Sequence, residues 1–174
     1  NKQKNISNGL KVSVELSKSN NVVAYRAKKK APKLNFRKTN FHNIIDYWEP
    51  LKSKNNSLII EKNKFYILRS KEKIRIPPNY AGEMVPYDTR IGDFRAHYAG
   101  FFDPGFGLTE LGASKTKAVL EVRSHDVPFL IEQDQTVCRL VYEPMANVPS
   151  ILYGEAGSSN NYQAQGLKLA KHFI

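Results

Sequence analysis

The 174-residue chain is 41% hydrophobic and holds nine Phe and nine Tyr, which is enough apolar material for the core of one domain spanning residues 1–174. No apolar run approaches the roughly 18 residues that a membrane span needs, and the first residues lack a signal-peptide pattern, so we expect a cytoplasmic protein with no membrane partner. The net charge of +11 is uneven, because residues 1–75 hold 19 Lys and Arg against 5 Asp and Glu, whereas residues 76–174 hold 8 against 11.

Short runs of alternating polar and apolar residues predict an all-β fold. The clearest are residues 11–16, 65–69 and 73–76, and many short strands are typical of a barrel or a sandwich. We expect few and short helices, with one turn over residues 79–83, while residues 40–48 fit either state. Turn signals separate the strands at residues 19–21, 54–57, 77–79, 103–105 and 132–134.

The single cysteine and the four histidines do not predict a metal site. Cys138 lies in the apolar run of residues 136–141, so an intrachain disulfide is excluded and we expect a buried apolar side chain. The histidines show no ligand spacing with one another or with Cys138. They are His42, His97, His125 and His172.

Two carboxylates stand out in the second half of the chain. In residues 117–123, alternation places Glu121 on the face opposite Ala118, Leu120 and Val122. Taken alone, Glu121 can equally be a solvated residue or the partner of Arg123 on the same face. Asp103 begins an Asp-Pro-Gly turn, and turn chemistry alone explains an aspartate there.

Four motifs follow one another in the second half of the chain, and a further motif lies in the tail. They are Arg90-Ile91-Gly92, Asp103-Pro104-Gly105, Val119-Leu120-Glu121 and residues 139–143, and the tail motif runs from Tyr153 through residues 161–166. The order of these motifs resembles the core of the dCTP deaminase branch of the dUTPase-like superfamily. The tail is similar to the family's closing segment, which carries a Tyr and a Gln. Upstream residues 9–14, 47–50 and 83–86 resemble the C-terminal repeat of the longer, two-repeat bacterial form.

This resemblance implies a distorted β-barrel, or β-clip, that is one repeat of a longer chain. It also implies a homo-oligomer, a trimer or pseudo-trimer of repeats, with nucleotide sites between neighbouring units. The family's reaction converts dCTP to dUTP and ammonia without zinc, and Mg²⁺ accompanies the triphosphate because multidentate phosphate binds that ion well.

The resemblance also assigns roles to six residues. Glu121 matches the general base that then acts as acid, a role that a half-shielded carboxylate with a raised pKa suits. The others match residues that bind substrate. Arg90 matches the arginine that holds the attacking water and the base edge, and Asp103 matches the acid that contacts the deoxyribose and pyrimidine. The backbone at Val119 matches the strand that reads the pyrimidine edge, and Tyr153 and Gln165 match the tail contacts to sugar and phosphate.

The chain departs from the family pattern at three places. Residues 86–89 stand where the family has a Ser-Ser pair before the arginine, Asn161 replaces a phosphate-binding lysine, and residues 108–115 lengthen the connection to Glu121. Fewer phosphate ligands weaken triphosphate binding, because a charged contact contributes about 1.5–3 kcal/mol. An alternative therefore stays open: a non-catalytic or partial-site repeat that supports oligomer assembly or nucleotide binding for an active repeat elsewhere in the parent chain.

Other function classes fit less well. Zinc-type cytidine deamination needs a His-x-Glu and a Pro-Cys-x-x-Cys motif, which one cysteine cannot supply. Residues 154–159 are too poor in Gly and Arg for the phosphate-gripping tail of a dUTPase-like pyrophosphatase. The basic first half carries no nucleic-acid-binding motif, so we expect a solvated basic face and no nucleic-acid partner.

Overall fold

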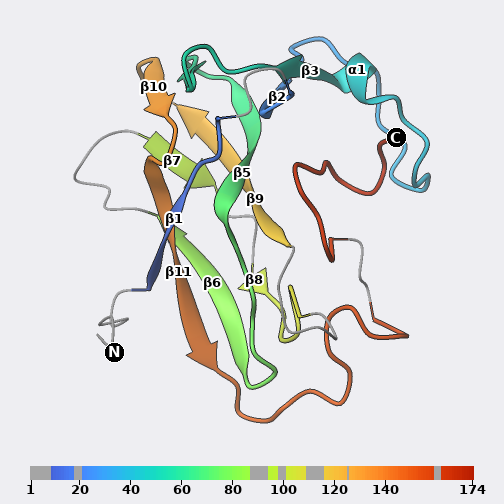
Figure 1. The fold of residues 1–174 in the computed structure, drawn as a ribbon. Helices are drawn as coiled ribbons and strands as arrows, with labels where there is room; N and C mark the ends of the chain where they lie inside the picture. The colour runs from blue at the N-terminus through green and yellow to red at the C-terminus, as the bar shows by residue number, and fades with distance from the viewer. Residues whose placement is uncertain are drawn as a thin grey trace.

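The computed structural model describes residues 9–17, 21–86, 94–97, 101–108, 116–124, 126–158 and 162–174, with residues 94–97 described as backbone. Within these ranges the chain is almost entirely strand and has one short helix (Figure 1). The elements in chain order are β1 (Leu10–Ser13), β2 (Ala24–Ala27), α1 (Ile44–Tyr47), β3 (Trp48–Leu51), β4 (Ser57–Ile60), β5 (Phe65–Lys73), β6 (Tyr80–Pro86), β7 (Phe94–His97), β8 (Phe101–Phe102), β9 (Lys117–Ser124), β10 (Phe129–Glu132) and β11 (Thr136–Pro144).

The strands form three antiparallel sheets around one core. The strand orders are β1-β11-β6-β8, β3-β2-β5-β9-β7 and β10-β4. A bridge between Val14 and Ser70 joins the first two sheets, and their buried side chains form a single hydrophobic cluster. The prediction of an all-β fold with few short helices is confirmed.

The first strand follows the predicted alternation. Val12, Val14 and Leu16 are at most 2% exposed, and β1 pairs with β11. Its register shifts at Ser13, whose backbone N–H donates to the Glu72 carboxylate at 2.8 Å. Every second side chain therefore remains buried through Leu16, although the regular pairing of β1 with β11 ends near Ser13.

The predicted turns that lie in the described residues are present. Asn55 and Asn56 have φ of 52° and 56°, the left-handed values that a tight hairpin turn needs and that Asn tolerates. The Pro77 carbonyl accepts from Tyr80 at 3.1 Å, and the Asp103 carbonyl accepts from the Phe106 N–H at 3.0 Å.

The helical turn expected over residues 79–83 is wrong, because β6 begins at Tyr80. This strand pairs with β11 along its whole length, from Pro86 opposite Cys138 to Tyr80 opposite Pro144. Gly82 lies so close to the core that a Cβ there would stand 2.7 Å from Ile76 Cδ1. Long-range pairing and close packing thus override the local turn propensity.

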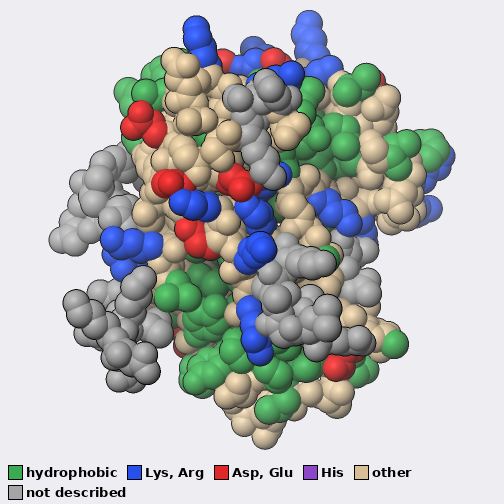
Figure 2. Space-filling model, in the orientation of Figure 1, with side chains coloured by type: hydrophobic (Ala, Val, Ile, Leu, Met, Phe, Trp, Pro, Cys, Tyr) green, Lys and Arg blue, Asp and Glu red, His purple; other side chains and the backbone are tan. Residues whose placement is uncertain are grey.

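Cys138 and the basic residues of segment 28–38 lie where the sequence predicts, whereas the Arg69 side chain is only 12% exposed and pairs with Glu15. Cys138 is fully buried on β11, and burial, with a contribution from the Glu72 charge, raises the pKa of its thiol to about 12. The cationic side chains of residues 28–38 are all exposed. Figure 2 shows Lys and Arg side chains along the upper edge of the molecule, next to hydrophobic side chains at its upper right. The described residues form no helix long and apolar enough to cross a membrane.

Candidate active site

A cavity of about 410 Å³ lies between the β5–β9 part of the sheet and the C-terminal segment. In Figure 1 the chain after β11 runs along the right-hand side of the molecule and ends beside α1. We call residues 162–170 the strap, because several of them close the cavity on the side away from the sheet. The lining residues are Trp48, Phe65, Ile67, Phe101, Phe102, Asp103, Phe106, Val119, Glu121, Tyr153, Tyr162, Gln165, Lys168, Leu169 and Ala170.

Strand β9 directs Glu121 into this cavity. Ala118, Leu120 and Val122 are fully buried in the core, so the opposite face of the strand presents Val119 and Glu121 to the cavity. Burial raises the pKa of the Glu121 carboxyl above its ordinary value. A carboxyl group with a raised pKa can both accept and release a proton closer to neutral pH.

Arg123 contacts Phe65, whereas the sequence analysis gave Glu121 as its alternative partner. Its guanidinium lies over the ring of Phe65, 5.5 Å from the centroid, and the Arg123 side chain is exposed. Phe65 is directly opposite Arg123 in the β5–β9 register, which explains the contact. The same register places Ile67 opposite Glu121.

The Asp-Pro-Gly turn after β8 builds the other end of the cavity. Gly105 has φ of +95°, and a Cβ there would lie 2.8 Å from both Leu152 Cβ and Tyr153 N. Because glycine leaves this space free, the Tyr153 N–H donates to the Pro104 carbonyl at 2.8 Å. The turn therefore presents Asp103 and holds Tyr153 beside it.

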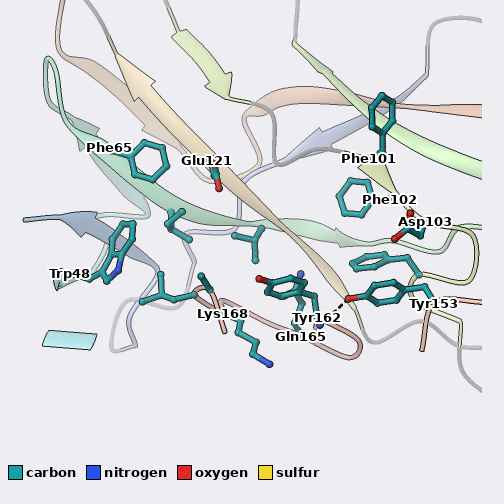
Figure 3. Close-up of a pocket in the computed structure, with 15 residues that line it drawn as sticks. Trp48, Phe65, Phe101, Phe102, Asp103, Glu121, Tyr153, Tyr162, Gln165 and Lys168 are labelled. Atoms are coloured by element: carbon teal, nitrogen blue, oxygen red, sulfur yellow. Dashed lines mark hydrogen bonds between the residues drawn. The ribbon is translucent and has the colours of Figure 1, made fainter. Parts of the chain in front are cut away.

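Tyr153 connects this turn to the strap. Its ring lies 5.5 Å from that of Phe106, and its hydroxyl oxygen accepts from the Tyr162 N–H at 3.0 Å (Figure 3). Burial raises the pKa of the Tyr153 phenol, and the hydrogen bond from the Tyr162 backbone N–H partly offsets this shift. The neutral phenol is thus the form present at neutral pH.

Gln165 fastens the strap to the start of β9. The Lys117 N–H donates to the Gln165 carbonyl at 3.1 Å, and Gln165 Nε2 donates to the Lys117 carbonyl at 3.2 Å. The side-chain oxygen Oε1 of Gln165 is buried and has no hydrogen-bond partner among the described residues. Gln165 thus lines the cavity while its side chain holds the strap against β9.

The last residues of the chain anchor the far end of the strap. The Phe41 and His42 N–H groups donate to the His172 carbonyl, at 3.1 and 2.9 Å, and the Ile174 N–H donates to the His42 carbonyl at 3.0 Å. The His42 ring contacts Phe173 edge-on, with centroids 6.5 Å apart. The strap is therefore held at both ends by residues distant in sequence.

Five of the six residues assigned by resemblance line the one cavity. They are Asp103, Val119, Glu121, Tyr153 and Gln165. Arg90, the sixth, lies outside the described residues, as does Asn161.

Other lining residues had no role in the sequence analysis. The aromatic residues around the Asp-Pro-Gly turn gave a usable signal, because Phe101, Phe102 and Phe106 flank it directly. Trp48 lies in one of the family-like segments, but nothing in the sequence placed it at the site. Phe65, Ile67 and the strap residues after Gln165 gave no local signal.

The antiparallel sheets around one core, with a carboxylate-lined cavity under a C-terminal strap, define a dUTPase-like β fold. The family model for "2'-deoxycytidine 5'-triphosphate deaminase (DCD), C-terminal domain" matches residues 1–173, and the chain belongs to this family.

Two relatives agree with this assignment. The chain is 27% identical over 112 residues to a protein of Methanobrevibacter smithii named "dCTP deaminase, dUMP-forming", covering 63% of this chain and 54% of the relative. It also matches the crystal structure of 2'-deoxycytidine 5'-triphosphate deaminase from Agrobacterium tumefaciens, with 44% sequence identity and a TM-score of 0.73, over 80% of this chain and 43% of that one. The chain thus spans about half the length of these relatives.

Proposed function

We propose that the protein hydrolyses the 4-amino group of dCTP to give dUTP and ammonia. The observation that carries this proposal is the position of Glu121, whose carboxyl pKa is raised by burial and which lines the same cavity as Asp103. Family membership over residues 1–173 supports the choice of nucleotide.

In the proposed reaction, water adds to the C4 atom of the pyrimidine. Glu121 accepts a proton from that water as the C–O bond forms and delivers it to N3 of the ring. It then takes the proton of the new C4 hydroxyl and delivers it to the amino nitrogen, which leaves as ammonia as the C4–N bond breaks and the C4=O bond forms. The carboxylate thus ends as it began, and no zinc takes part. A pKa raised toward the working pH suits both steps, because the group must be a competent base and then a competent acid.

The remaining residues of the cavity bind and orient the nucleotide in this proposal. Asp103 contacts the deoxyribose and the backbone at Val119 reads the pyrimidine edge, while Tyr153 and Gln165 contact the sugar and phosphate. Arg90 holds the attacking water. Mg²⁺ enters as the partner of the triphosphate, so its binding follows that of the substrate.

The test is release of ammonia and dUTP from dCTP and Mg²⁺ by the protein in its natural full length. Glu121→Gln removes the proton acceptor and keeps the shape of the side chain, so we expect loss of turnover by at least about 100-fold, as for other general bases. Glu132→Gln, at an exposed position of β10, is the matched control and keeps its turnover. Unchanged turnover in Glu121→Gln would place the chemistry elsewhere.

We further propose that the chain is the C-terminal repeat of a parent that assembles as a trimer or pseudo-trimer. The wording of the family description supports this, as does the Agrobacterium tumefaciens structure, of which this chain covers only 43%. If Glu121→Gln keeps turnover in the parent but loses assembly or nucleotide binding, the partial-site alternative is correct.

The name of the Methanobrevibacter smithii protein favours a second product, dUMP. Formation of dUMP needs hydrolysis of the triphosphate in addition to deamination. Chromatography of the nucleotide products distinguishes the two reactions, because it separates dUTP from dUMP. Release of pyrophosphate accompanies only the formation of dUMP.

A further inference from the structure

The cavity extends beyond Glu121 to an apolar end that the roles assigned above leave unused. Trp48 and Phe65 form this end, with ring centroids 6.1 Å apart and planes inclined at 48°. Leu169 and Ala170 of the strap line the cavity as well. Phe173 packs edge-on against Trp48 at 6.2 Å and supports the indole from behind.

The two ends of the cavity differ in chemistry. Figure 3 shows Trp48 and Phe65 on one side of Glu121, and Asp103 and Tyr153 on the other. One end offers the Asp103 carboxylate and the Tyr153 phenol beside phenylalanine rings. The other offers aromatic and aliphatic carbon together with the buried Trp48 indole N–H, which has no hydrogen-bond partner among the described residues. Glu121 lies between them.

A bound nucleotide must place its sugar at the Asp103 end and its base between Glu121 and the Trp48–Phe65 end. The inference rests on the proposed function, in which Asp103 contacts the deoxyribose and Glu121 faces C4 of the base. The pyrimidine edge farthest from the sugar then points toward Trp48 and Phe65. C4 is flanked by N3 and C5, and in the proposed function the Val119 backbone reads the polar N3 side. C5, whose substituent does not leave during the reaction, is therefore the position that faces Trp48 and Phe65.

We propose that the Trp48–Phe65 end accepts an apolar substituent at C5 of the base, so that the substrate class includes 5-methylated deoxycytidine triphosphate. Rings and aliphatic side chains stabilise a methyl group by removing it from water. Burial of one such group corresponds to about a fourfold gain in affinity. We therefore expect 5-methyl-dCTP to bind about fourfold more tightly than dCTP.

The experiment measures Kd for both nucleotides with Mg²⁺ by calorimetry, in the Glu121→Gln protein so that turnover does not interfere. The readout is the ratio of the two Kd values, because an inactive or unfolded fraction cancels from it. Trp48→Ala and Phe65→Ala, each added to that background, should bring the ratio from about four to about one. Ile59→Ala is the control, because it removes an apolar side chain of β4 that is 59% exposed and outside the cavity, and it should leave the ratio unchanged.

Trp48 also provides an optical readout, once the contribution of any other tryptophan of the full-length protein is subtracted with the Trp48→Ala variant; residues 1–174 hold no second tryptophan. A methyl group that contacts the indole should change its emission more than dCTP does, in the same Glu121→Gln protein. Weaker binding of 5-methyl-dCTP, or a ratio that neither Trp48→Ala nor Phe65→Ala changes, would overturn the inference while dCTP deamination stands. If neither nucleotide binds to the Glu121→Gln protein and the wild type releases no ammonia from dCTP, both the proposed function and this inference fail.

Discussion

Replacing Gly105 by alanine tests whether the Asp-Pro-Gly turn holds Tyr153 at the site. The new Cβ would lie 2.8 Å from Leu152 Cβ and Tyr153 N and 3.0 Å from Tyr153 O. Two of these three atoms are backbone, which cannot turn aside as a flexible side chain can. The segment around Tyr153 must therefore move away from the turn.

The size of the effect follows from two contributions. An L-residue at a φ of +95° costs about 1–2 kcal/mol of backbone strain. Displacing Tyr153 also breaks its 2.8 Å hydrogen bond to Pro104, which contributes about 0.5–1.5 kcal/mol. We expect a total loss of about 1.5–3.5 kcal/mol in the free energy of unfolding, before any cost of the steric clash itself.

Gly157→Ala is the matched control. Gly157 has φ of +89°, and a Cβ there meets nothing within 4 Å, so this variant carries the backbone strain of about 1–2 kcal/mol alone. Denaturant unfolding and the Kd for dCTP are measured for both variants. Equal losses of stability, together with unchanged nucleotide affinity in Gly105→Ala, would refute the role of the turn.

Three further predictions concern single side chains. Because burial raises the folded-state pKa of Glu121, activity should rise with pH through a value above that of an ordinary glutamate. The same shift makes stability fall as pH rises between the unfolded and folded pKa values, so Glu121→Gln should be at least as stable as the wild type at pH 7; a lower stability would contradict this. Cys138, with its thiol pKa raised to about 12, should react with a thiol reagent at about pH 8 only after unfolding, and rapid labelling of the native protein would show the burial to be wrong. Tyr153→Phe removes the oxygen that accepts from the Tyr162 N–H at 3.0 Å, so exchange of that amide should quicken by about tenfold in hydrogen-exchange measurements, for a bond of about 1 kcal/mol or slightly more.

The sequence predicted the site best where local rules decide the geometry. Period-two alternation was enough to put Glu121 on the face opposite the core. The Asp-Pro-Gly motif was enough to end a strand in a turn that carries Asp103. Both predictions depend on residues adjacent in sequence, so no knowledge of distant pairing was needed.

The rest depends on which strands pair and in what register. Trp48 on β3 and Phe65 on β5 contact each other across the intervening strand β2. The sequence of neither strand shows which strands it pairs with. The same is true of residues 79–83, where a local turn preference lost to pairing of β6 with β11. The strap could be assigned to the site only by resemblance, because its own residues show no periodicity that fixes where they pack.

The anchoring of the strap has a consequence for how the protein opens. The His172 ring is bonded to the Lys38 carbonyl across 134 positions of chain, and contacts of such long separation form late in folding because closing a large loop costs entropy. Segments that join last and bury little tend to detach first while the remainder stays intact. A protease should therefore cut near residue 170 well before the sheets come apart. A ligand bound in the cavity should delay that cut and also raise the melting temperature, because it binds only the folded protein.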